Sequence, residues 1–68
     1  MTNEQQYETG VRAGRSAVRG VIETGYWSWL RSQIALCRQM SATYPYAKGY
    51  VYGANEAIEV EFRIDGAQ

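Results

Sequence analysis

The segment that decides the fold class is residues 46–65, YAKGYVYGANEAIEVEFRID. In its second half, apolar residues alternate with charged residues from Ile58 to Asp65, which is the period-two pattern of a half-buried β-strand. Tyr46 to Tyr52 is the predicted partner strand, and the small and polar residues 53–56 are typical of a turn. The sequence therefore predicts an antiparallel β-hairpin with strands at about residues 46–52 and 57–64.

Two amphipathic helices are predicted before the hairpin. In the first, at about residues 3–23, apolar and small residues recur every three or four positions, namely Tyr7, Val11, Gly14, Val18 and Val21. Thr2 and Gln5 have the spacing of a capping box, and Gly25 suits the end of a helix. The second, at about residues 26–41, ends before Pro45, because proline disfavours helical geometry in the residue that precedes it. We expect a single domain, residues 1–68, with an α+β fold of order ααββ in which both helices pack on the hairpin.

Small residues lie along one edge of the first predicted helix. Gly10, Gly14 and Ala17 share this edge with Val21. Each glycine costs about 1 kcal/mol relative to alanine inside a helix, so we expect the edge to be used for close helix packing. The Gly10-x-x-x-Gly14 spacing resembles that of membrane helix dimers, but the neighbouring arginines exclude a membrane span.

The residue composition argues against an enzyme. The 68 residues include one cysteine and no histidine, so an internal disulfide and a Cys/His metal site are both excluded. Cys37 has no histidine to activate it and is interpreted as a small buried apolar residue. Glu59 and Glu61 fall on the predicted strand with no pocket implied, and no glycine-rich phosphate loop occurs. We expect no catalytic residue, no metal and no cofactor.

Size and terminal sequence bear on partners and location. A chain this short buries only about 60% of its unfolded surface, so oligomerisation or docking on a larger partner is the expected source of added stability. No apolar run reaches the roughly 20 residues that span a bilayer, and the first residues lack the features of a signal peptide. A lone cysteine suits the reducing cytoplasm. We expect a cytoplasmic protein with no membrane partner.

Basic residues supply the first candidate binding surface. Arg12, Arg15 and Arg19 share one helix face, and Arg31 and Arg38 of the second helix are candidates to join them. Such a surface suits phosphates or an acidic protein. The alternative is a solvated helix face, because Glu8 and Glu23 lie one turn away and the net charge is zero.

Aromatic residues supply the second candidate surface. Trp29, Tyr46, Tyr50 and Tyr52 are assigned to a partner or oligomer interface, where tyrosine and tryptophan are enriched. Trp27 and Trp29 lie about 200° apart on a helix, so one is expected in the core and Trp29 in the interface. Base stacking and closure of the core are the alternatives for the tyrosines.

These features predict a non-enzymatic interaction module that docks on a macromolecule. Self-association as a homodimer or a protein partner is favoured, and an inhibitor or regulator of a host protein, of the kind that phages encode, fits the size. The alternative is a nucleic-acid-binding regulator that uses the basic face of the helices. A further alternative is a structural subunit of a larger assembly.

Overall fold

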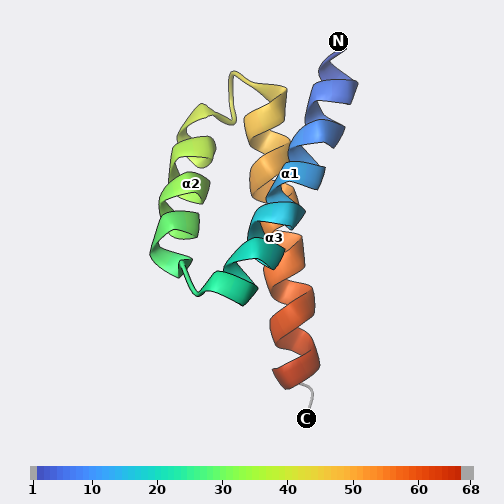
Figure 1. Ribbon diagram of the computed structural model, residues 1–68. Coiled ribbons are helices and arrows are strands. Elements are labelled where there is room, and N and C mark those ends of the chain that lie inside the picture. The colour runs from blue at the N-terminus through green and yellow to red at the C-terminus, as the bar shows by residue number, and fades with distance from the viewer. Residues whose placement is uncertain (1, 67–68) are drawn as a thin grey trace.

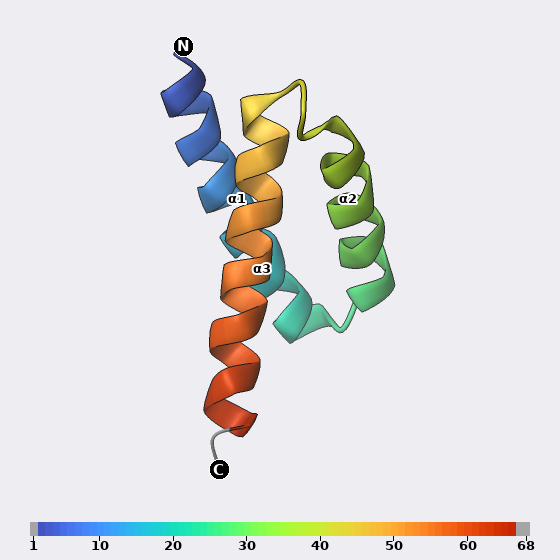
Figure 2. The same cartoon turned by 180° about the vertical axis from the view of Figure 1, so that it is seen from behind.

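The computed structural model describes the backbone of residues 2–66 and the side chains of residues 2–61, and within this part the chain forms three helices and no strand (Figure 1). They are α1 (Asn3–Thr24), α2 (Trp27–Met40) and α3 (Pro45–Gly66). Helices α1 and α3 run side by side in the same direction, and α2 runs back beside them in the opposite direction (Figures 1 and 2). The fold is therefore all-helical.

The predicted α+β fold is wrong, because α3 contains both predicted strands, 46–52 and 57–64, together with the predicted turn at 53–56. Pro45 is the first residue of α3, a position where its fixed φ and missing N–H favour a helix. The helical period is carried mainly by Ala47, Tyr50 and Ala54, which are buried at spacings of three and four. A helix also satisfies its own backbone hydrogen bonds, whereas a two-stranded hairpin leaves two open edges.

The alternating residues of the predicted second strand do not form a buried face where the structure describes them. Glu59, Val60 and Glu61 are all exposed on α3. The side chains of Phe62 to Asp65, on which the rest of the alternation rests, lie outside the described residues. In the sequence, the bulky apolar residues at every second position indicate a strand more strongly than the small alanines indicate a helix, so the predicted period is wrong.

Helices α1 and α2 begin and end within one residue of the predicted ranges. The capping box is confirmed: the Thr2 hydroxyl accepts a hydrogen bond from the Gln5 backbone N–H at 3.1 Å, and the Gln5 side chain accepts one from the Thr2 backbone N–H at 2.9 Å. Gly25 ends α1 with φ of 81°, the left-handed conformation that glycine adopts without a Cβ clash. These local signals fix the orientation from which α2 starts.

Two glycine pairs hold α1 and α3 together at backbone contact. Gly10 and Gly14 of α1 face the backbone of α3, and Gly49 and Gly53 of α3 face the backbone of α1. A Cβ atom at any of these four positions would lie under 3.0 Å from an atom of the opposite helix. Each helix thus carries a Gly-x-x-x-Gly motif, the arrangement that allows helices to approach closely.

The apolar core lies where all three helices meet. Val18 and Val21 of α1, Leu30 of α2 and Ala54 of α3 form its buried cluster, and partly buried side chains surround it: Ala17, Trp27, Ile34, Ala57 and Ile58. Leu30 is the one residue of α2 that is fully buried. Helix α2 therefore attaches to the α1–α3 pair along a narrow strip, and much of its surface stays exposed.

Candidate functional site

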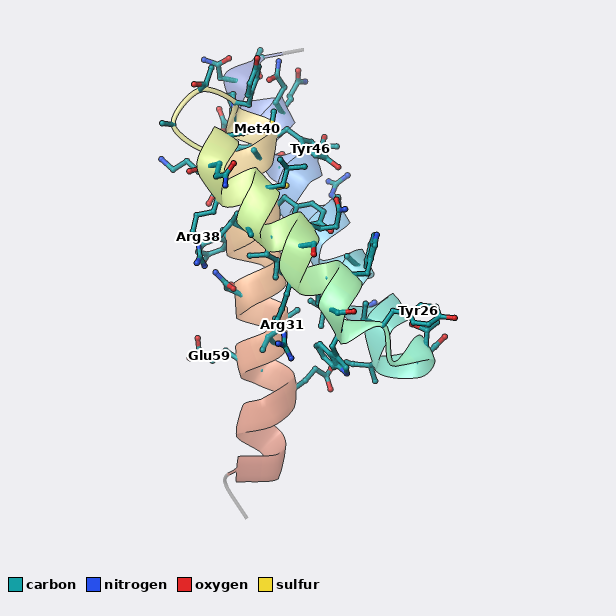
Figure 3. All side chains as sticks on the ribbon, turned by 90° about the vertical axis from the view of Figure 1, so that its left-hand side faces the viewer. Tyr26, Arg31, Arg38, Met40, Tyr46 and Glu59 are labelled. Carbon is teal, nitrogen blue, oxygen red and sulfur yellow. The ribbon has the colours of Figure 1, made fainter. Side chains whose placement is uncertain are left out.

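The predicted basic residues do not form one surface. Arg12, Arg15 and Arg19 are exposed on α1, where Arg15 forms an ion pair with Glu56 of α3. Figure 3 shows that Arg31 and Arg38 instead lie on the flank of α2 that faces Glu59 of α3. Among the described residues, Glu56 thus lies beside Arg15, and Glu59 lies on the side of α2 that carries Arg31 and Arg38.

A small polar cluster joins α1 to α3 on the exposed side of their contact. The Arg15 guanidinium donates a hydrogen bond to the Glu56 carboxylate, and this lowers the pKa of Glu56 below its usual value. The Tyr52 hydroxyl also donates to Glu56, and this hydrogen bond raises the pKa of Tyr52. The ring of Tyr7 lies against that of Tyr52, with centroids 6.3 Å apart. This arrangement ties two helices together and includes no nucleophile.

The predicted aromatic surface is divided between two sides of α3, because the helix replaces the strand that would have aligned its members. Tyr50 is only 7% exposed, and burial raises the pKa of its hydroxyl. Tyr46 lies one turn before Tyr50 and is exposed, with ring centroids 6.4 Å apart. Tyr52 belongs to the polar cluster with Glu56. Of the predicted set, Trp29, Tyr46 and Tyr52 are exposed, and Tyr46 lies on the flank of α2 opposite Glu59 (Figure 3).

Helix α2 carries an exposed apolar row. Trp29, Leu36 and Met40 are 49%, 51% and 40% exposed, and the half-buried Gln33 lies between the first two. The spacings of four, three and four residues are those of a coiled-coil contact row. These four residues are hereafter the α2 seam. Trp27, by contrast, packs against the core.

The α2 seam contains no charged residue. The charged residues of α2 are Arg31 and Arg38. Both lie on the flank of α2 near Glu59, whereas Tyr46 lies on the opposite flank (Figure 3). One side of α2 is therefore apolar and the other is basic.

A groove continues the α2 seam onto α1. Its volume is about 340 Å³, and its lining is mainly apolar and small: Ala17, Gly20, Val21, Thr24, Tyr26 and Trp29. Gly20 is exposed on α1, and a Cβ atom there would have nothing within 4 Å. Gly10 and Gly14 are required by the contact with α3, but no contact among the described residues requires Gly20.

Three residues of this surface are not among the site residues predicted from the sequence: Leu36, Met40 and Gly20. The row at positions 29, 33, 36 and 40 was visible in the sequence as a coiled-coil spacing. The groove was not, because Gly20 is distinguished from the other glycines of α1 only by the path of α3.

The described residues also bear on metal binding, nucleophilic chemistry and membrane insertion. There, no group of three or more His, Cys, Asp or Glu side chains is placed to hold a metal ion. Burial raises the pKa of the Cys37 thiol, which favours the protonated, less nucleophilic form. Within the same residues, no helix combines the length and the apolar character needed to cross a membrane.

No protein family, curated protein or solved structure matches the chain.

Proposed function

We propose that the protein is a non-enzymatic interaction module that docks on another polypeptide through the α2 seam and the groove beside it. The observation that carries the proposal is the row of Trp29, Leu36 and Met40, three large apolar side chains that are about half exposed on one side of a helix. Full burial of one such side chain from water contributes about 1.5–3 kcal/mol, and each of the three is already about half buried, so covering the remaining surface contributes roughly half of that for each. Contiguous apolar surface of this kind marks interaction sites in small proteins.

The uncharged character of the α2 seam favours a protein partner over nucleic acid. A nucleic-acid surface needs several unopposed cations, whereas Arg15 is paired with Glu56 and the chain has no net charge. Tryptophan and large aliphatic side chains in one row suit the centre of a protein interface. Action as an inhibitor or regulator of a host protein, and a cytoplasmic location, stay predictions within this proposal.

Site-specific photocrosslinking tests the proposal. A benzophenone amino acid at Leu36 in the α2 seam is compared with the same residue at Asn55, which is exposed on α3. In cells that express the protein, we expect a polypeptide adduct from position 36 and little or none from position 55. Absence of any polypeptide adduct from position 36, or equal adducts from both positions, would overturn the proposed function.

A further inference from the structure

We infer that the occupant of the α2 seam is the α2 seam of a second copy of this chain, in antiparallel orientation around a two-fold axis. This inference rests on the proposed function and names its partner. The positions of the seam are symmetric about its centre, between Gln33 and Leu36. Antiparallel pairing therefore sets Trp29 against Met40 of the second copy and Gln33 against Leu36 of the second copy. Thioether sulfur and an aromatic ring form a favourable contact.

Charge favours this pairing. Arg31 and Arg38 make α2 positive overall, so two copies would repel each other if these residues met. They lie on the opposite flank of α2 from Tyr46, on the side of Glu59 (Figure 3), which removes both arginines from the contact. The antiparallel arrangement also places the positive end of one helix dipole beside the negative end of the other. The uncharged seam thus meets itself without repulsion.

The exposed surface of the chain is larger than that of a compact monomer of the same mass. The chain exposes 4973 Å², whereas a compact monomer of 7.7 kDa exposes about 4300 Å², so the excess is about 650 Å². A standard interface buries about 800 Å² on each partner. The excess belongs to the whole elongated chain, which is 40 Å in its longest dimension, and it is of the same order as one partner's share of an interface.

The groove gives the second copy a specific place to bind. In the antiparallel arrangement, Met40 of the second copy lies opposite Trp29, beside the groove of about 340 Å³ between α1 and α2. Methionine is flexible and fills irregular apolar hollows. This arrangement accounts for the open space around Gly20, because a side chain at this position would occupy the groove that receives Met40 of the second copy.

Sedimentation velocity on the purified full chain tests the inference. We expect a concentration-dependent species of twice the 7.7 kDa chain mass. Leu36→Glu should raise the dissociation constant roughly 100-fold or more, as expected for a charge placed at the centre of an interface. Ala35→Glu is the matched control, because it adds the same charge to the neighbouring exposed position of α2 outside the seam, and it should change the constant less than about threefold.

Gly20→Leu keeps the test decisive if Leu36→Glu weakens the fold. Leucine favours a helix over glycine, so the substitution should leave the isolated chain at least as resistant to urea. It should nevertheless weaken the dimer about tenfold or more, because the groove is filled. A dimer that survives both Leu36→Glu and Gly20→Leu would overturn the inference.

The remaining outcomes separate the inference from the proposed function. A chain that stays monomeric at millimolar concentration, yet forms position-36 adducts with a different protein in cells, overturns the second copy as occupant and leaves the docking function standing. A monomer that forms no adduct with any polypeptide overturns both. A dimer whose position-36 adducts contain only this chain supports both.

Discussion

A Cβ atom added to Gly14 of α1 would lie 2.7 Å from the amide nitrogen of Ala54 in α3. The two helices therefore meet backbone to backbone, and their parallel pairing depends on the absence of side chains at this contact. The α1–α3 pair is the platform that presents α2. The α1–α3 contact requires glycine at positions such as Gly14. It does not require glycine at Gly20.

Gly14→Ala should destabilise the fold by about 1–3 kcal/mol, because the clash with the α3 backbone exceeds the roughly 1 kcal/mol that alanine contributes to helix propensity. Gly20→Ala, at an open position of the same helix, should stabilise the chain by about 1 kcal/mol. Urea unfolding followed by circular dichroism, with both changes made in a Leu36→Glu background to keep association out of the comparison, measures the two effects. Equal free energies of unfolding for the two variants would contradict the glycine contact.

The polar cluster should give the fold a dependence on acid pH. The Arg15 hydrogen bond lowers the pKa of Glu56 in the folded chain, so the stabilisation is present above the ordinary carboxyl pKa and is lost as the pH falls through the lowered value. Between about pH 5 and pH 3, wild-type stability should fall more than that of Glu56→Gln. Melting temperatures across this range measure the difference, and identical pH profiles would show that the ion pair contributes nothing.

The sequence predicts helices α1 and α2 but not helix α3. Val18, Val21 and Leu30 occupy the buried side of long periodic segments, so α1 and α2 followed from spacing and from the caps at Thr2 and Gly25. Helix α3 did not follow, because Ala47 and Ala54 bury little area each and are overlooked beside the alternation of Ile58 and its neighbours. Their burial depends on the glycine contact with α1. The edge of Gly10 and Gly14 indicates close helix packing, but no local pattern shows that residues 45–66 are the partner.

The candidate site was predicted in part for the same reason. Trp29 was assigned to an interface from its angle on a helix, which a single helix determines. The ion pair between Arg15 and Glu56 joins residues 41 positions apart. In the sequence, the acidic residues nearest to the arginines of α1 are Glu8 and Glu23, so the true partner is not evident. The groove at Gly20 depends on how α1 and α2 diverge, which is a property of the whole bundle.

Reversing the charges on the outer face of α1 should leave association intact. The Arg12→Glu and Arg19→Glu double variant changes two exposed residues outside the α2 seam and outside the pair with Glu56. We expect an unchanged yield of adducts from position 36 and a dissociation constant within about threefold of wild type, because exposed charges contribute little. Loss of the position-36 adducts, or a dissociation constant as high as that of Leu36→Glu, would assign the basic residues to the interface.

Disulfide trapping should reveal the orientation of the two copies. In a Cys37→Ala background, chains with Gln33→Cys are mixed in equal amounts with chains carrying Leu36→Cys and are treated with a mild oxidant. Antiparallel pairing brings position 33 of one chain to position 36 of the other, so the mixed disulfide should exceed both like-with-like products. A predominance of 33–33 and 36–36 products would indicate parallel helices instead.

Fluorescence of Trp29 tests the central claim most directly, because it reports burial of the α2 seam itself. In a Trp27→Phe chain, Trp29 is the remaining tryptophan and is about half exposed in the single chain. As the concentration of purified protein rises, its emission maximum should move to shorter wavelength, and Leu36→Glu should abolish the change. An emission maximum that stays at the wavelength of a solvated tryptophan at every concentration, with or without Leu36→Glu, would contradict the second copy as the occupant of the α2 seam.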